Sequence, residues 1–497
     1  MRIGDEPKIP ADLKIISQEN RYNHPADSAT IYDGNIGIEI RGRYSASLPQ
    51  KPYGFETRDL LGENLNVPLF HMPAENDWIL LANYNDKTFM RNSLSFEVFR
   101  KMGHYAPRTQ FCEVMVNGEY QGIYILTEKI KRDLGRVDIS TLNPDENSGD
   151  DVSGGYIIKI DYYADFDSWT SDYAPIGYGD KKVHFVYHYP DPEGITGAQK
   201  MYIQNFIHQV ETSLYSANTP DRQKKLYALI DINSFIDYFI VGEVSRNVDA
   251  YKKSAYFYKD KDSNGGKLHA GPVWDFDWAW KNIHECFFGS TDGSGWAYQV
   301  HKCDPWPVPP SWMERLLEDQ YFTQQLNARY FSLRASHLSE ASLFHYIDSV
   351  AAVLDEAQQR HYGKWPILGL NVGAPEVDEQ PRTYAGEVEK FKAWIAKRLQ
   401  WLDGHMPGFV VTAIERPEVN SGNLVFPNPA STQITIQATQ PIEHYSIYTS
   451  NGVAILMNNP SASSVSVDTN SFMPGLYFVK THHADGSQWT GKFVKAE

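Results

Sequence analysis

The residues of this sequence best suited to chemistry are two aspartates, Asp275 and Asp277, in the segment 271–280. If the segment is extended, residues two apart point to the same side, so both carboxylates would face one point in space. Such carboxylates repel each other unless a cation or a shared proton lies between them. Hard oxygen ligands suit Mg²⁺, Mn²⁺ or Ca²⁺, so the sequence predicts a metal site. The alternative is a solvated Asp-x-Asp beside core aromatics.

A third candidate is Asp249, which follows a predicted helix and lies 26 residues before Asp275 (275 − 249). One predicted hairpin separates these two aspartates. Kinase-like enzymes place a catalytic-loop aspartate and a metal-binding aspartate on either side of such a strand pair. The spacing therefore favours a role for Asp249 in orienting an acceptor hydroxyl. The alternative is a loop aspartate that caps local amides after the helix.

The elements that must position these aspartates change character along the chain. Residues 1–165 are predicted to be mainly β with one helix, because apolar residues alternate in stretches such as 36–40. Residues 166–408 are predicted to be mainly helical, because apolar residues recur there at helical spacing. A β-rich N-lobe followed by a helical C-lobe that carries the catalytic and metal-binding loops is how kinase-like enzymes are built.

The end of the chain is predicted to form a separate unit. Residues 409–422 include Pro417 and Ser421-Gly422 and are interpreted as a linker. Residues 423–497 contain short alternating strands and a turn signal at Asn451-Gly452. The predicted fold class is therefore α+β: a divergent two-lobed kinase-like fold followed by a small all-β immunoglobulin-like sandwich.

The overall composition excludes some functions and leaves others open. A formal net charge of −16 over 497 residues argues against a grip on nucleic acid or on an anionic membrane. No apolar run approaches the ~20 residues of a transmembrane helix. The three cysteines contain no Cys-x-x-Cys pair, so a thiolate zinc site is not expected. Cys286 and Cys303 could form a disulfide if the protein is exported, which would leave Cys112 free.

Several short stretches resemble the CotH family of spore-coat protein H-like atypical kinases, over residues from about 30 to 290. The matching stretches include Ile38-Glu39-Ile40-Arg41-Gly42, Lys51-Pro52-Tyr53, Met90-Arg91-Asn92, Thr127-Glu128-Lys129-Ile130, Asn247-Val248-Asp249 and Trp274-Asp275-Phe276-Asp277. The resemblance implies a divergent kinase fold that binds ATP with Mg²⁺ or Mn²⁺. It also implies transfer of the γ-phosphate to Ser or Thr of secreted or surface proteins.

The resemblance assigns expected roles to the acidic residues. Asp249 would be the catalytic residue that orients the acceptor hydroxyl, and Asp275 would be a metal ligand. Asp277 would be either a second metal ligand or a structural acceptor. Glu128 would orient a cation of the nucleotide site, and the alternative for it is a salt bridge at a strand end.

Three basic residues are candidates for contacts with the phosphates of ATP: Arg41, Lys51 and Arg91. The guanidinium fork of arginine matches phosphate oxygens well. Arg91 is expected on the polar side of the one N-terminal helix. The alternative for each of these residues is a solvated surface charge.

The last segment, 423–497, resembles a type IX secretion (Por) C-terminal sorting domain. The stretches that carry this resemblance are Val425-Phe426-Pro427-Asn428-Pro429-Ala430, Gly475-Leu476-Tyr477 and Lys492-Phe493-Val494-Lys495. It implies a Bacteroidetes-type origin, handling by the type IX secretion machinery, a secreted or outer-membrane surface location, and attachment to surface polysaccharide. Such cargo needs a signal peptide, and the polar start of the chain lacks one. We therefore expect the true N-terminus to lie before residue 1.

Departures from the kinase pattern leave two other functions open. Ser254 stands where a kinase-like catalytic loop usually carries a metal-binding Asn, Glu56 stands where a base is usual, and no glycine follows Asp275-Phe276. These departures favour a non-catalytic surface interaction protein that keeps a kinase-like fold. Paired carboxylates in an aromatic-lined cleft would also suit a Ca²⁺-stabilised protein that binds or hydrolyses glycans.

Overall fold

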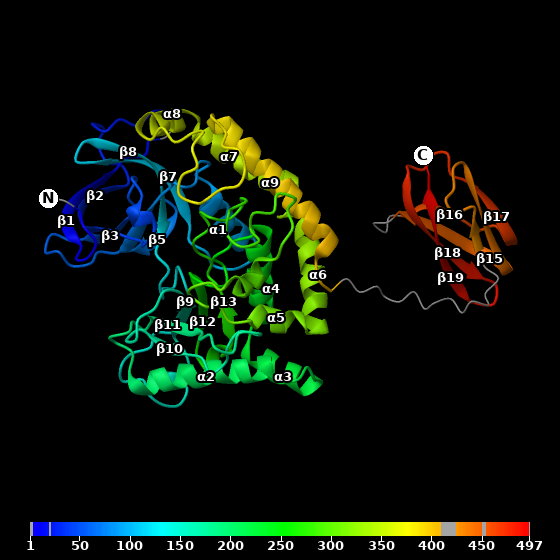
Figure 1. Ribbon diagram of the computed structural model, residues 1–497, viewed down its shortest axis with the longest axis horizontal. Helices are drawn as coiled ribbons and strands as arrows, with labels where there is room; N and C mark the ends of the chain where they lie inside the picture. Colours follow the sequence, from blue (N-terminus) through cyan, green and yellow to red (C-terminus); the bar gives the residue numbers. More distant parts are fainter. Residues whose placement is uncertain (1–2, 19–20, 409–423, 450–453, 497) are drawn as a thin grey trace. The chain divides into compact units, whose positions relative to one another are not determined.

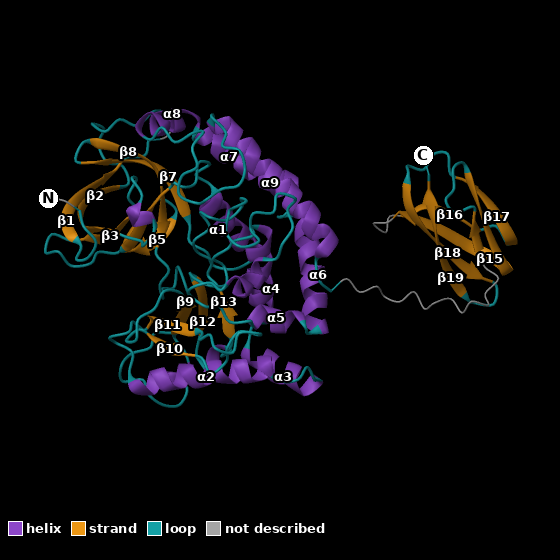
Figure 2. Ribbon diagram, in the orientation of Figure 1, coloured by secondary structure: helices purple, strands orange, loops and turns teal. Residues whose placement is uncertain are grey.

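The computed structural model describes residues 3–18, 21–408, 424–449 and 454–496 (Figures 1 and 2). The chain divides into two compact units, residues 1–409 and 410–497, and each is described by itself. The predicted linker 409–422 and the predicted turn at Asn451-Gly452 lie outside the described residues.

The first unit begins with an antiparallel sheet of six strands. In spatial order these are β1 (Ile9–Ile15), β2 (Tyr32–Ile40), β3 (Tyr53–Arg58), β6 (Asp77–Ala82), β8 (Glu119–Glu128) and β7 (Thr109–Val116). A small two-stranded sheet, β4 (Val67–Leu69) and β5 (Met72–Glu75), lies within the same stretch of chain. The apolar alternation of β2 is confirmed, because Ile36 and Ile38 face a buried core and Ile38 pairs with Phe55 of β3.

Helix α8 (Asp355–Lys364) packs on this sheet. Three further helices extend this packing: α7 (Glu340–Val353) contacts α8 and α9 (Tyr384–His405), and both α9 and α1 (Arg91–Lys101) contact α4 (Ile232–Val244). Figure 1 shows α8 over β8. The contact is specific, because the buried His361 of α8 accepts a hydrogen bond at Nδ1 from the Ile123 amide of β8, at 3.0 Å. Segments separated by more than 200 residues are thereby joined.

The second sheet of the unit has five strands and is packed among helices (Figure 2). Its order is β10 (Ser168–Thr170), β11 (His184–Tyr189), β9 (Tyr156–Ile160), β12 (Ala255–Lys259) and β13 (Leu268–Ala270). The remaining helices are α2 (Gly197–Tyr215), α3 (Pro220–Leu229), α4 (Ile232–Val244), α5 (Trp312–Leu317) and α6 (Gln320–Arg334). The predicted boundary at 165/166 thus falls inside this sheet. Because β9 pairs with β12, it belongs with the later segments and not with the first sheet.

Helix α4 is the centre of the unit. Asp231 caps its first turn by accepting a hydrogen bond from the Ser234 amide at 2.8 Å. Its residues from Ser234 to Val244 are all buried, as expected of a helix surrounded by protein. The chain that leaves α4 therefore starts from a fixed point, and that chain carries Asp249.

The second unit is all-β, as the sequence predicts. Its strands are β14 (Leu424–Phe426), β15 (Gln433–Thr449), β16 (Ala454–Asn458), β17 (Ala462–Asp468), β18 (Gly475–His483) and β19 (Gln488–Lys495). The first part of β15 pairs with β14 and β17, and its later part pairs with β16 and β18. Ile434, Ile447, Val479 and Phe493 lie in the buried core of this unit.

None of the helices in the described segments combines the length and the apolar character needed to cross a bilayer.

A buried acid in α2 makes the stability of the first unit depend on pH. Ser171 Oγ donates to one carboxylate oxygen of Glu211 at 2.7 Å, and Trp312 Nε1 donates to the other at 3.1 Å. Burial nevertheless raises the pKa of Glu211 from its ordinary 4.5 to about 7. The folded protein thus disfavours the charged form. This penalty is absent below the unfolded pKa, grows as the pH rises from about 4.5 to about 7, and is constant above that.

We predict that Glu211→Gln raises the free energy of unfolding at about pH 8 by roughly 1–3 kcal/mol and has little effect at about pH 5. The neutral amide avoids the cost of burying a charge, and it can still accept from Trp312 and donate to Ser171. Thermal and urea unfolding at the two pH values measure the difference. The exposed Glu193→Gln is the control. An equal effect of Glu211→Gln at both pH values would contradict the expected titration.

Candidate active site

Asn247 connects the two loops that carry the candidate aspartates. Its side-chain oxygen accepts a hydrogen bond from the Asp249 amide at 3.0 Å, and its Nδ2 donates to the Asp275 carbonyl at 3.2 Å. Asn247 is fully buried just beyond α4, so these bonds do not compete with water. The structure therefore brings Asp249 and Asp275 together, as their spacing predicts.

The Asp249 carboxylate is buried and has one oxygen free of hydrogen bonds. Lys253 Nζ lies 3.0 Å from Oδ2, whereas Lys252 Nζ lies 3.6 Å from Oδ1, beyond hydrogen-bond distance. Within the described part of the chain, Oδ1 has no hydrogen-bond partner. Burial raises the pKa of Asp249, the two lysines oppose this shift, and the charge of Asp277 adds to it.

The expectation that Asp275 and Asp277 lie in an extended segment is wrong. Strand β13 ends at Ala270, and Asp275 has φ = 69°, in the left-handed region that few residues other than glycine adopt. The two carboxyl groups are close nonetheless. Burial raises the pKa of Asp275 well above its ordinary value, and the neighbouring Asp277 and Asp249 raise it further. The predicted proximity is thus correct, but a turn and not a strand produces it.

Two asparagines from the N-terminal half hold this turn. Asn85 Nδ2 donates to Asp277 Oδ2 at 2.6 Å, and Asn92 Oδ1 accepts from the Phe276 amide at 2.7 Å. Ser254 Oγ donates to Asp275 Oδ2 at 3.3 Å. The acidic turn is therefore fixed from both halves of the unit by uncharged partners.

Of the three predicted phosphate-binding residues, Arg41 lies closest to the aspartates. Its guanidinium lies 5.6 Å from the ring centroid of Trp274. Burial lowers the pKa of Arg41, and nearby groups that include Tyr256 and Asp275 oppose that shift. Lys51 instead turns back on its own loop, where Nζ donates to the Ala46 carbonyl at 2.9 Å.

The prediction that Arg91 lies on the polar side of its helix is wrong. Arg91 is buried at the first position of α1. It forms an ion pair with Asp86, and its Nη1 also donates to Thr88 Oγ1 at 3.1 Å. The Asp86 carboxylate accepts from the Arg91 amide at 2.9 Å as well, so this pair stabilises the start of the helix. A contact between Arg91 and phosphate stays a prediction.

Glu128, the last residue of β8, forms a salt bridge with Arg108, which is the alternative for this residue and not the predicted contact with a cation of the nucleotide site. The fully buried Glu128 carboxylate accepts from the Arg108 backbone amide at 2.8 Å and from its Nη1 at 2.7 Å. Tyr105 donates to the same carboxylate at 3.3 Å. Arg41, Lys51 and Arg91 are not among its hydrogen-bonding or ion-pair partners in the described residues.

Lys253 is the residue of the site that the sequence analysis missed. Burial opposes its charged form, but Asp249 and Asp275 outweigh burial and raise its pKa. Its Nζ lies 5.9 Å from the ring centroids of both Tyr162 and Trp278. The only sign of it in the sequence was that a lysine stands four residues after the candidate catalytic aspartate. This spacing brings the two side chains together only if the chain between them forms a turn, which the sequence alone did not establish.

The aspartates fit a divalent cation by the chemistry of their oxygen donors. Asp275 and Asp277 form a close pair, and Asp249 Oδ1 adds a buried oxygen with no hydrogen-bond partner in the described part of the chain. In that same part of the chain, no three His, Cys, Asp or Glu side chains are arranged as a metal-binding group. Mg²⁺ commonly uses one or two carboxylates and completes its coordination with substrate phosphates and water. The pair suits that mode of binding.

Comparison with known proteins confirms both family resemblances, that of the N-terminal region and that of the C-terminal segment. The sequence model of the family described as CotH kinase protein matches residues 38–402, and that of the secretion system C-terminal sorting domain matches residues 424–496. Inner spore coat protein H of Bacillus subtilis (strain 168) is 23% identical over 295 residues, which are 57% of this chain. The match spans 65% of the length of that relative.

Among the solved structures that match is one that covers a short part of the chain. It is a DUF3244 family protein from Bacteroides vulgatus with an immunoglobulin-like β-sandwich fold, 17% identical to this chain. The match covers 16% of this chain and 87% of the other, with a TM-score of 0.14. A score this low supports no inference about the fold.

We predict that Asp275→Asn stabilises the protein in the absence of divalent cations, by about 1 kcal/mol. The amide removes one of two repelling charges, and Asn tolerates positive φ. Mn²⁺ should raise the melting temperature of the wild-type protein but not that of the variant. Thermal unfolding with EDTA and with Mn²⁺ measures both effects.

The exposed Asp145→Asn is the matched control, because this carboxylate has no described ionic or hydrogen-bond partner. If Mn²⁺ stabilised Asp275→Asn as much as the wild-type protein, Asp275 would not be a ligand.

Proposed function

Because the chain belongs to the CotH kinase protein family, we propose that it transfers the γ-phosphate of ATP to Ser or Thr of exported proteins. One observation supports this proposal above the others. A buried aspartate with a free oxygen, Asp249, lies beside a close carboxylate pair and a charged lysine. In-line phosphoryl transfer needs an oriented acceptor hydroxyl, a bridging metal and positive charge on the phosphates.

The aspartates divide into two roles in this proposal. Asp249 Oδ1 accepts the hydrogen bond of the acceptor hydroxyl and orients its oxygen towards the γ-phosphorus, while Lys253 holds Oδ2. Asp275 and Asp277 hold Mg²⁺ or Mn²⁺. When bound there, the metal would neutralise charge on the phosphate oxygens.

Two cationic side chains supply the remaining positive charge. Arg41 approaches the Asp275 side of the site, and Lys253 approaches the Asp249 side. In the proposal both contact phosphate oxygens, and Arg41 offers the fork geometry that these oxygens favour. The aromatic rings of Trp274, Trp278 and Tyr162 beside these cations limit the access of water, which strengthens the charge interactions.

The C-terminal sorting domain indicates secretion and attachment at the cell surface. A disulfide joins Cys286 and Cys303, while Cys112 is free, as expected for an exported form of this chain. The substrates in the proposal are therefore other exported proteins, and the type IX secretion machinery and surface polysaccharide are the partners proposed for the sorting domain.

A second candidate function is a kinase-like surface protein that binds partners without turnover. Ser254 favours it, because a hydroxyl that bonds to Asp275 replaces the amide that usually binds a second metal. A second departure, Glu56, does not favour this function. Glu56 pairs with Lys8 at 2.8 Å and with Arg58 at 3.0 Å, so it has local structural partners.

We predict that the wild-type protein incorporates ³²P from labelled ATP with Mn²⁺, into itself or into exported proteins. Asp249→Asn should lower the rate about 100-fold or more while ATP with Mn²⁺ still stabilises the protein, because the general base is lost and the metal pair is kept. Asp275→Asn should lose both transfer and that stabilisation. Asp145→Asn is the control for both variants.

Each outcome separates the two candidate functions. Stabilisation by ATP with Mn²⁺ and transfer that depends on Asp249 support the kinase. Neither stabilisation nor transfer in the wild-type protein would contradict it and favour the non-catalytic function.

A further inference from the structure

Glu285 lies in a short loop whose two ends are fixed in the core. The Ile283 amide donates to the Phe288 carbonyl at 3.1 Å, and the Phe288 amide donates to the Glu285 carbonyl at 3.0 Å. Ile283 and Phe288 are both buried, whereas the Glu285 side chain is about a third exposed, at 37%. The loop therefore holds this carboxylate at the surface, while the two ends of the loop are buried.

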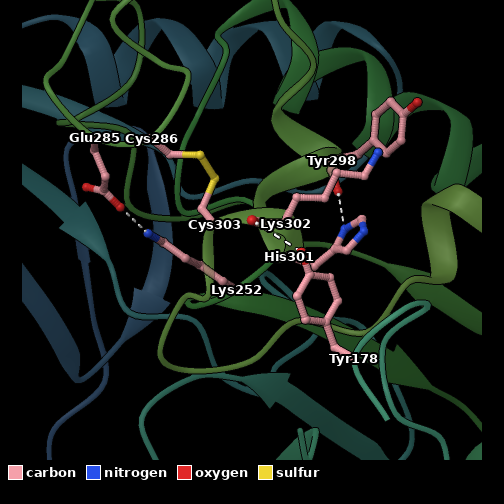
Figure 3. Close-up of a disulfide and its surroundings, with 8 residues drawn as sticks. All are labelled: Tyr178, Lys252, Glu285, Cys286, Tyr298, His301, Lys302 and Cys303. Atoms are coloured by element: carbon pink, nitrogen blue, oxygen red, sulfur yellow. Dashed lines mark hydrogen bonds and ion pairs between the residues drawn. A yellow bond between two sulfur atoms is a disulfide. The ribbon is translucent and has the colours of Figure 1, made fainter. Parts of the chain in front are cut away.

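The residue after Glu285 ties the tip of this loop to another segment. Cys286 is joined to Cys303 by a disulfide, with 5.8 Å between the Cα atoms (Figure 3). Cys303 ends the 3₁₀ turn Ala297–Cys303, which is anchored by its buried residues and by His301, whose Nε2 lies 3.1 Å from a Glu314 carboxylate oxygen. The disulfide thus connects the tip of the Glu285 loop to a fixed point.

Glu285 determines where the ammonium group of Lys252 lies. Lys252 Nζ is 2.7 Å from Glu285 Oε1, and Figure 3 shows the two side chains directed at each other beside the disulfide. The same Nζ is 3.6 Å from Asp249 Oδ1. Lys252 is almost fully buried, so these two carboxylates compete for its charge with little screening by water.

This arrangement keeps Asp249 Oδ1 free of hydrogen bonds in the described residues, while the Lys252 ammonium stays within ion-pair distance at 3.6 Å. Lys253 occupies Oδ2, and Glu285 holds Lys252 beyond hydrogen-bond distance of Oδ1. If Glu285 were neutral or displaced, Lys252 would have no competing anion and would move onto Oδ1. The oxygen required for the acceptor hydroxyl would then be occupied, and its basicity would fall.

We propose that Glu285 is a positioning residue for Asp249, that it acts by holding Lys252, and that the Cys286–Cys303 disulfide holds Glu285 in place. The inference rests on the proposed kinase function. It implies that the site is complete only after the disulfide has formed. In that step the two thiols together give two electrons and two protons to the disulfide of a donor protein in an oxidising compartment, and the donor is reduced to a dithiol. Formation of the disulfide on export would then accompany the gain of activity.

A double-mutant cycle tests the link through Lys252. Glu285→Gln should lower the initial rate of ³²P transfer at saturating ATP and Mn²⁺ about tenfold, as is typical of residues that orient a catalytic group. The KM for ATP should stay unchanged, because Glu285 does not reach the proposed phosphate contacts. The same Glu285→Gln change is then made in the Lys252→Met protein. The rate of the double variant should differ from that of Lys252→Met alone by less than about twofold.

Reduction tests the role of the disulfide. Dithiothreitol passes two electrons and two protons to the two sulfurs and becomes a cyclic disulfide. It should lower the rate of the wild-type protein and of Cys112→Ser about as much as Glu285→Gln does, and should change the Glu285→Gln protein little further. The double variant Cys286→Ser/Cys303→Ser should behave like the reduced protein. Circular dichroism at the assay temperature confirms that each form is folded.

The outcomes distinguish this inference from the proposed function. No transfer by the oxidised wild-type protein would overturn both. Transfer by the wild-type protein with an equal rate for Glu285→Gln would overturn the inference alone, and so would an equal tenfold loss in the Lys252→Met background. A pH–rate profile of Glu285→Gln identical to that of the wild-type protein, at a lowered rate, would point to a merely structural role and would also overturn it.

Discussion

The structure of the site depends on one constraint, the close approach of three carboxylates, of which Asp249 is buried and Asp275 and Asp277 are half-buried. Burial raises the pKa of Asp249 and of Asp275, and the neighbouring Asp277 raises both further. Lys253 offsets only part of this repulsion. A fold optimised for stability alone would avoid such a group, so its presence is an argument for function. The excess negative charge is what a divalent cation and its phosphate ligands would balance.

The partners that fix these aspartates are mostly uncharged, so they position the carboxylates without balancing their charge. Asn247, Asn85 and Asn92 hold the two loops by amide hydrogen bonds, which set position without neutralising the carboxylates. Apart from the ion pair between Lys253 and Asp249, the full ion pairs lie one layer further out. Lys281 illustrates the transition: its Nζ donates to the Asn85 carbonyl at 2.9 Å and lies 3.4 Å from Glu376. The site is thus rigid in position but remains electrostatically unbalanced.

The sequence predicted what local patterns determine. The alternation of β2, the all-β second unit and the proximity of the aspartates follow from spacing and residue type. The Cys286–Cys303 disulfide is the pairing that the sequence left open for an exported protein. The sequence failed where contacts outside the local pattern decide. Arg91 was predicted on the polar side of its helix because its burial depends on an ion pair with Asp86, which lies before the helix. The segment that forms β9 was counted with the β-rich region 1–165 because its pairing with β12 spans about a hundred residues. Lys253 and Glu285 were missed because their partners are set by turns.

The turn at Asp275 departs from the kinase pattern and still brings two carboxylates together. Kinase-like sites usually place a glycine two residues after the metal-binding aspartate, and this chain carries Asp277 there. The reversal of the backbone is supplied by Asp275 itself, with φ = 69°. Such a conformation costs about 1–3 kcal/mol and persists only if the surroundings enforce it. The bond from Asn92 to the next amide and that from Asn247 to the Asp275 carbonyl do so. The position two residues after Asp275 can then carry a second carboxylate, Asp277, which would bring more negative charge to a bound cation than a glycine could.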